Sequence, residues 1–139
     1  MLTAQRTAPP MSSLKVLLQD VSLFCEEQEA VATRDACNDA MTKLHFAYDR
    51  HIEVQAIGAV VSFPLYMNDV FVTLLKVELP VAVLVIACYG CVLDQLRERW
   101  WVKSAGKRLV ETCSSKTLST NPTFTALLER ARAEVGLLS

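Results

Sequence analysis

The sequence predicts an all-α protein, a single-domain bundle of about six helices around one buried central helix, because three patterns agree. A charge-free run, LPVAVLVIACYGCVL from Leu79 to Leu93, is apolar on every side, as in a helix enclosed by others. Several flanking segments place apolar residues at helical spacing behind a capping residue. Residues 58–63 are rich in β-branched side chains, but no second convincing strand exists to pair with them.

The length and composition fit one folded domain. The chain has 139 residues, of which 52% are hydrophobic and 21% charged, with a net charge of −1. This charge gives no electrostatic case for direct nucleic-acid contact, which is typical of strongly basic domains. We expect a loose leader over residues 1–11, which contain Pro9-Pro10, and a single helical domain over residues 12–139.

The leader and the cysteines indicate the compartment. The leader lacks the apolar core of a signal peptide, so we expect an intracellular protein, cytoplasmic or nuclear. Five cysteines, an odd number, then predict reduced thiols rather than a disulfide framework. The run from Leu79 to Leu93 ends at Asp94 and is shorter than the roughly 20 apolar residues that cross a bilayer, so no membrane span is expected.

Two helices are predicted before residue 52. The first follows Ser12 or Ser13 as its cap, and the second begins near Thr33. Their expected inward residues are Leu14, Leu17, Leu18, Val21, Phe24 and Cys25 in the first, and Cys37, Ala40, Met41, Leu44, Tyr48 and His51 in the second. Phe46 falls on the polar face of the second helix. It either contacts a partner or a later segment, or it is a lone exposed aromatic.

The middle of the chain is less regular. Residues 52–67 are apolar without a clear period, and with Gly58 and Pro64 they favour short helix or irregular packing. Asn68 is a predicted cap for a helix over residues 69–77, and residues 78–80 form a tight corner into the central helix, where Pro80 takes the first position. Gly90 inside that helix indicates that a neighbouring backbone or a ligand lies close.

Two further helices complete the bundle. Residues 100–113 read as a helix that places Trp101 on the core side and Trp100 on the other side. Residues 114–120 form a polar linker. Asn121 and Pro122 then begin the last helix, whose expected inward residues are Phe124, Leu127, Leu128, Ala131 and Val135, and Gly136 ends it.

Few residues suggest catalysis or metal binding. Cys88 and Cys91 have the spacing of redox and zinc motifs, but they lie inside an apolar helix and no further ligands complete a site, so buried thiols are favoured. His45 and His51 do not share a metal-binding spacing. His45 can contact a ligand or carry a proton, although a structural histidine is favoured. The sequence therefore assigns no metal, no cofactor and no catalytic residue.

Large side chains are dense around the predicted core. They are Phe63, Tyr66, Met67, Phe71, Tyr89, Trp100 and Trp101. Pockets for apolar small molecules are lined by such residues, with a few polar groups that orient the ligand. Ordinary cores have the same composition, so the pattern does not by itself decide between a pocket and a core.

A family resemblance favours the pocket. Ser62-Phe63-Pro64, the corner at Pro80, the helix AVLVIACYGCVL and the segment WWVKSAGKRLVE resemble, in order and spacing, the C-terminal regulatory region of fungal zinc binuclear cluster transcription factors of the sterol-uptake-control type. The resemblance covers roughly residues 40 to 113. Phe63 stands where that family has a Trp, and the family's Cys-rich DNA-binding cluster is absent. The chain would therefore be a fragment of such a factor or a stand-alone descendant of its regulatory domain.

The resemblance implies a ligand-sensing and dimerising helical domain. The implied ligand is an apolar small molecule, such as a sterol, a terpenoid or a polyketide, and the implied partner is a second copy of the chain. We expect the ligand beside the Trp-Trp helix, in a cavity closed by aromatic side chains with a polar contact from His45 or Tyr48. The predicted binding residues are Trp100, Tyr89, Tyr66, His45, Tyr48, Phe63 and Met67.

Two other functions fit the same sequence. A stand-alone enzyme of fungal secondary metabolism, of the cyclase or pericyclase type, would use the same cavity to fold a polyene or isoprenoid substrate, mainly by positioning. A helical protein that binds a partner without any pocket would instead leave apolar surface exposed.

Overall fold

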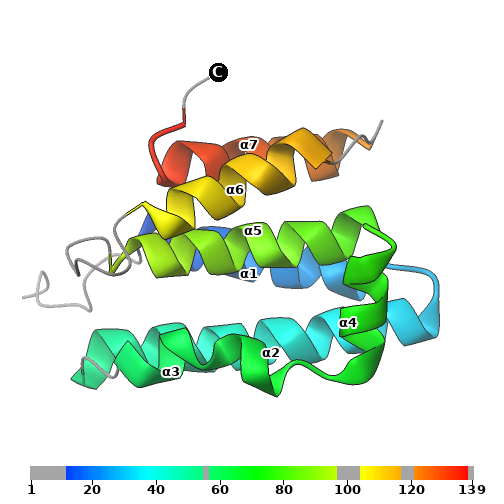
Figure 1. The fold of residues 1–139 in the computed structure, drawn as a ribbon. Coiled ribbons are helices and arrows are strands. Elements are labelled where there is room, and N and C mark those ends of the chain that lie inside the picture. The colour runs from blue at the N-terminus through cyan, green and yellow to red at the C-terminus, as the bar shows by residue number, and fades with distance from the viewer. Residues whose placement is uncertain (1–11, 55–56, 97–103, 117–120, 138–139) are drawn as a thin grey trace, which may run out of the picture.

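Seven α-helices and one short 3-10 helix make up the part of the chain that the computed structural model describes, residues 12–54, 57–96, 104–116 and 121–137 (Figure 1). In chain order they are α1 (Ser13–Glu26), α2 (Val31–Val54), α3 (Ile57–Val61), the 3-10 helix η2 (Phe63–Tyr66), α4 (Asp69–Lys76), α5 (Pro80–Asp94), α6 (Ala105–Lys116) and α7 (Pro122–Glu134). The protein is an all-α bundle, as the sequence predicts. The leader and the two tryptophans lie outside the described residues.

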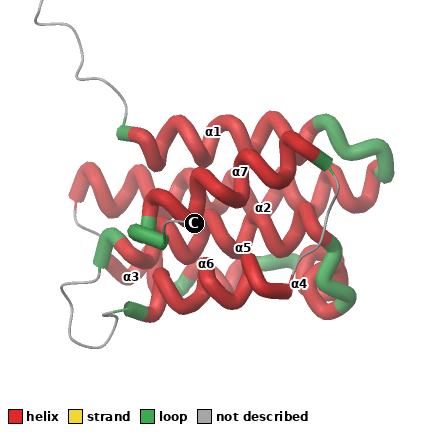
Figure 2. Tube along the Cα trace, turned by 90° about the horizontal axis from the view of Figure 1, so that it is seen from above, coloured by secondary structure: helices red, strands yellow, loops and turns green. Residues whose placement is uncertain are grey.

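The helices form three layers (Figure 1). α6 and α7 lie in one layer, α1 and α5 in the middle, and α2 with α3 in the third, while α4 joins the third layer to α5. In the view from above, the long helices of the three layers run roughly parallel to one another (Figure 2). α5 contacts α1, α2, α6 and α7, so the central helix predicted from its apolar composition is at the centre of the bundle.

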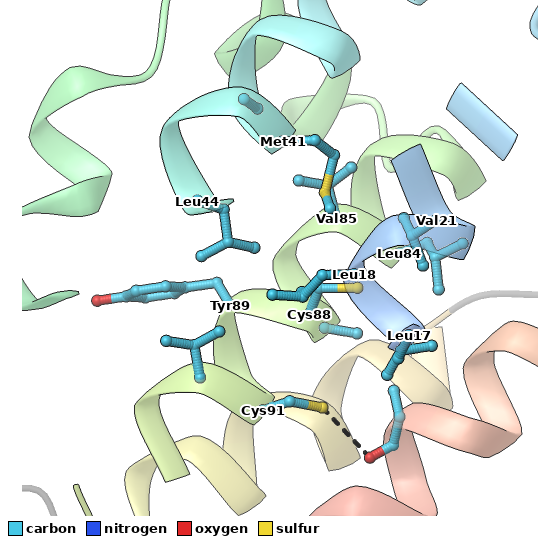
Figure 3. Close-up of a cluster of buried hydrophobic side chains, with 14 of the residues drawn as sticks. Leu17, Leu18, Val21, Met41, Leu44, Leu84, Val85, Cys88, Tyr89 and Cys91 are labelled. Atoms are coloured by element: carbon cyan, nitrogen blue, oxygen red, sulfur yellow. Dashed lines mark hydrogen bonds between the residues drawn. The ribbon is translucent and has the colours of Figure 1, made fainter. Parts of the chain in front are cut away.

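Side chains from α1, in the same layer, and from α2, in the third layer, converge on α5. Figure 3 shows Leu17 and Leu18 of α1 and Met41 and Leu44 of α2 around Val85, Cys88 and Tyr89. The α1 and α2 residues in this group are at most 1% exposed. Because each fully buried aliphatic side chain stabilises the fold by about 1.5 to 3 kcal/mol, this cluster holds the middle layer on the third.

Two glycines allow α5 and α6 to approach closely. A Cβ on Gly90 would lie 2.8 Å from the Val110 Cγ2 and 2.9 Å from the Gly106 carbonyl oxygen. A Cβ on Gly106 would overlap the Gly90 carbonyl oxygen and lie 2.6 Å from the Asp94 backbone nitrogen. The close approach expected at Gly90 is therefore made by the backbone of α6, and the space beside this glycine is not a ligand site.

Three predicted caps begin their helices. The Ser12 Oγ accepts a hydrogen bond from the Lys15 backbone N–H at 3.1 Å. The Asn68 Oδ1 accepts from the Phe71 N–H at 2.8 Å, and the Asn121 Oδ1 accepts from the Phe124 N–H at 3.1 Å. Each cap satisfies one of the backbone donors that the first turn of a helix leaves free.

Some boundaries differ from the sequence-based expectation. α2 begins at Val31 rather than near Thr33, since the Arg34 N–H already bonds the Ala30 carbonyl at 2.9 Å. The irregular stretch before Asn68 contains α3 and η2, which adds a helix to the expected six or so. α6 continues to Lys116, within the segment expected to be a linker.

A sharp corner joins α4 to α5, as predicted. The two helix axes differ by 104°, and Glu78 in the corner has a positive φ of 56°. Within the described ranges, no individual helix combines the length and apolar character needed to cross a membrane; only α4 and α5 taken together would meet that requirement, across their bend.

Candidate functional site

An apolar groove lies on the outer side of α2, where α3 and η2 pack against it. Its volume is about 560 Å³. The residues that line it come from α2 and from residues 59–66: Thr42, Lys43, Phe46, Ala47, Ala59, Ser62, Phe63 and Tyr66. We call this the α2–η2 groove. Its volume is in the range of pockets that hold small organic ligands, roughly 300 to 1,000 Å³.

Three aromatic rings shape the groove. Phe46 and Tyr66 are each 63% exposed, whereas Phe63 is 2% exposed. Phe46 is the residue whose position on the polar face of its helix did not fit the sequence pattern. It shares the groove with a later segment of the chain, and most of its surface remains exposed. Large aromatic side chains left in water on both sides of one groove are unusual in a protein without a ligand or partner.

The floor of the groove is tied to the central helix. The ring of Phe63 packs on that of Tyr89 in α5, with centroids 4.9 Å apart and planes inclined by 30°. The Tyr89 hydroxyl donates a hydrogen bond to the Val60 carbonyl at 3.0 Å, and burial raises the pKa of this hydroxyl. The stacking and the hydrogen bond hold α3 and η2 on α5, so the floor is a preformed surface.

A polar clamp holds η2 against α2. The Lys43 ammonium lies 2.8 Å from the Asp39 carboxylate and donates a hydrogen bond to the Tyr66 carbonyl. The Asn68 side-chain amide donates to the same carboxylate at 3.0 Å. Since Asn68 also caps α4, this network fixes the end of η2 and the start of α4 relative to α2.

Two of the sequence-predicted binding residues lie on another face of α2. The His45 Nε2 is 3.0 Å from the Ser22 Oγ, and the imidazole also bonds the Leu18 carbonyl. Burial and the nearby Lys15 lower the pKa of His45. The Tyr48 hydroxyl is 3.1 Å from the Ser12 Oγ. Both side chains join α2 to α1, which is the structural role that the sequence favoured for His45.

The remaining predicted residues divide between the groove and its surroundings. The structure brings Phe63 and Tyr66 together in the groove and places Tyr89 beneath Phe63. Met67 is half-buried and packs against the edge of the core, without lining the groove. Trp100 lies outside the described residues. Among the other lining residues, only Phe46 carries a signal in the sequence, its position on a polar helix face.

A second cavity has a different chemistry. It lies where α5 ends, α6 begins and α7 ends, with a volume of about 610 Å³. Its lining is largely polar or charged and includes Asp94, Ser104, Lys107 and Glu134. It lacks the aromatic side chains that recognise an apolar ligand, so we take the α2–η2 groove as the candidate site.

The cysteines belong to the core. All five are free and buried. The Cys91 thiol donates a weak hydrogen bond to the Ala131 carbonyl at 3.4 Å (Figure 3), and burial raises the pKa of Cys88 to about 12. The Cys25 thiol donates to Cys37, which raises the pKa of Cys25 and lowers that of Cys37. In the described ranges, no three His, Cys, Asp or Glu side chains group as metal ligands.

Comparison with protein-family models, with curated proteins and with solved structures finds no significant match to this chain. Its function is therefore inferred from the chemistry of its own residues.

Proposed function

We propose that the chain binds a small apolar molecule in the α2–η2 groove. One observation carries the proposal: Phe46 and Tyr66, each 63% exposed, line a groove of about 560 Å³ whose floor is the buried ring of Phe63. A planar or chain-like hydrocarbon laid between these rings would contact aromatic carbon on three sides. The binding geometry requires little rearrangement, because the stacking of Phe63 on Tyr89 already fixes the floor.

The exposed rings supply the driving force. A large aromatic side chain carries roughly 200 Å² of surface, so each of the two rings leaves on the order of 125 Å² in water. Covering that area stabilises the bound state by about 3 kcal/mol per ring at 25 cal/mol per Å². Two rings supply about 6 kcal/mol before the entropic cost of binding, which is a useful contribution to a micromolar affinity of about 8 kcal/mol.

The resemblance to fungal regulatory domains supports the same proposal and suggests the ligand class. In that view the molecule is a ligand-sensing domain, and its ligand is a sterol, a terpenoid or a polyketide. The enzyme alternative would place a polyene or isoprenoid substrate in the same groove. No described geometry specifically favours it, because the ionisable Lys43 in the lining is paired with Asp39.

The test measures binding of farnesol, ergosterol and a linear polyene by calorimetry or by ligand-induced changes in the melting temperature. Phe46→Ala and Tyr66→Ala should each weaken binding about tenfold, as expected for an aromatic side chain that anchors a ligand. Because both side chains are mostly exposed, their removal should change the free energy of unfolding by only about 0.5 kcal/mol.

Leu23→Ala is the matched control, since Leu23 is 57% exposed on α1, outside the groove. It should leave the affinity unchanged. If none of the three probes binds the wild-type protein, or if the control weakens binding as much as the groove variants, the groove is not the ligand site.

Self-association is the second part of the proposal. Val61 is 40% and Leu65 is 82% exposed on the same segment that lines the groove. Val61 precedes Ser62 and Leu65 precedes Tyr66, both of which line the groove. Exposed apolar side chains that gather at one site are typical of interaction surfaces. We propose that a second copy packs on Val61 and Leu65 in a symmetric dimer, in which this surface meets its own equivalent and the groove stays open to the ligand.

Sedimentation velocity over a range of concentrations tests the dimer. Leu65→Asp should shift the protein toward the monomer, whereas Leu23→Asp on α1 should not. A wild-type protein that remains monomeric at high micromolar concentration would contradict this part of the proposal and leave ligand binding to be judged separately.

The proposed location is intracellular, in the cytoplasm or nucleus. Five free buried thiols are in keeping with a reducing compartment.

A further inference from the structure

The charges beside the groove are already matched. Lys43 is the cation in the lining, and its ammonium lies 2.8 Å from the Asp39 carboxylate, four residues earlier on the same helix. A second N–H of the same ammonium donates a hydrogen bond to the Tyr66 carbonyl. One N–H of Lys43 therefore remains for a ligand, but its positive charge is balanced by a carboxylate at contact distance.

The neutral polar groups of the groove are hydroxyls. The Ser62 Oγ donates its proton to the Gly58 carbonyl at 2.6 Å, which leaves the oxygen free to accept a hydrogen bond. Thr42 contributes a further hydroxyl in the lining and is exposed. The groove thus offers an N–H donor from Lys43 and hydroxyl oxygens that accept, which suits a group that both donates and accepts.

We infer that the groove selects an apolar molecule with a neutral hydroxyl over the matching carboxylic acid, and that Asp39 sets this selection by balancing the charge of Lys43. The inference rests on the proposed function. An alcohol can accept from Lys43 and donate to Ser62. A carboxylate can accept a hydrogen bond but has no proton to donate, and its charge must lose water on entering an apolar groove. Asp39 also repels the carboxylate and so offsets the attraction of Lys43.

Asp39→Asn separates charge from geometry. Asparagine has nearly the same shape, and its carbonyl oxygen can still accept the hydrogen bonds from Lys43 and Asn68. The substitution removes the negative charge and replaces the other carboxylate oxygen by an NH2 group, so Lys43 then faces the ligand as an unbalanced cation. Coupling between exposed charges is worth up to about 1 kcal/mol, so the affinity for a carboxylate should rise on the order of 2- to 5-fold.

The experiment compares farnesol with farnesoic acid at pH 8, where the acid is ionised. The wild-type protein should bind farnesol more tightly. Asp39→Asn should raise the affinity for farnesoic acid by about 2- to 5-fold and change the affinity for farnesol by less than about 2-fold. Asp35→Asn is the matched control, because it makes the same change one turn earlier on α2 at a residue outside the groove lining, and it should alter neither affinity.

The outcomes separate this inference from the proposed function. If neither probe binds, the proposed function fails. If both bind but the acid binds as tightly as the alcohol or more tightly, the groove binds apolar ligands and the inferred selection is wrong. If the alcohol is preferred but Asp39→Asn leaves the ratio unchanged, or Asp35→Asn changes it equally, the role assigned to Asp39 is refuted.

Discussion

Replacing Gly106 by alanine should destabilise the protein, although alanine is the better helix former. In an open helix this change stabilises by about 0.5 to 1 kcal/mol. Here the new methyl group would overlap the Gly90 carbonyl oxygen and lie 2.6 Å from the Asp94 nitrogen. Both obstacles are backbone atoms of α5, so no side-chain rotation relieves them, and the two helices must separate.

The magnitude follows from the two opposing effects. Overpacking a core costs about 1 to 3 kcal/mol, and a clash with backbone belongs at or above the upper end of that range. After the helix propensity is subtracted, the free energy of unfolding should fall by about 2 kcal/mol. At about 3 to 4 °C per kcal/mol for a chain of this size, the melting temperature should fall by roughly 7 °C.

Gly58→Ala is the control, because a Cβ at Gly58 meets nothing within 4 Å. The free energy of unfolding of this variant should rise by about 0.5 kcal/mol, because only the difference in helix propensity acts there. Urea titrations followed by circular dichroism give both free energies. A Gly106→Ala protein as stable as wild type, or shifted in the same direction as Gly58→Ala, would show that α5 and α6 do not meet at these glycines.

Three further predictions concern single contacts. Glu78→Gly should stabilise the protein by about 0.5 to 1 kcal/mol in thermal melts, because the φ of 56° at this corner disfavours a side chain. A loss of stability would show that other contacts of Glu78 outweigh its backbone strain. The lowered pKa of His45 means that the unfolded chain binds its proton more readily, so stability should be full above about pH 6.5 and fall as the pH decreases through the folded pKa. His45→Gln should flatten that dependence in urea titrations between pH 5 and 8, and an unchanged slope would assign it to other groups. Tyr89→Phe should cost about 1 to 2 kcal/mol in the same titrations, since it leaves the buried Val60 carbonyl without its donor, and a neutral effect would contradict the anchoring of α3.

The helices and the core were predictable because their signals are local. Capping residues such as Asn68 and Asn121 bond backbone groups only a few residues away, so their chemistry can be read along the chain. The apolar positions of α1 and the fully apolar α5 follow from the same periodicity, since a side that lacks charge must be covered. The start of α2 lies two residues before the expected Thr33, at Val31, where no strong cap marks it.

The candidate site was only partly predictable. The sequence predicts Phe63 and Tyr66 as ligand contacts and places Phe46 on a polar helix face. The helical period could not show that Phe46 of α2 and Tyr66 of η2 line one groove, because that depends on how residues 57–66 fold back on α2. His45 and Tyr48 were expected at the ligand, but their hydrogen bonds join α2 to α1, since the neighbours across a helix face are not set by spacing.

The sequence by itself determined the helical class, the identity of the central helix, the corner before Pro80 and the burial of the thiols. Each of these depends on local propensity or on the cost of exposing apolar surface. Only the tertiary structure decided what lies beside Gly90. A glycine in an apolar helix permits a close approach by either a ligand or a backbone, and the packing of α6 through Gly106 assigns it to the backbone. In the same way, the hydrogen bond from Lys43 to the Tyr66 carbonyl depends on where η2 ends, and long-range packing sets that position.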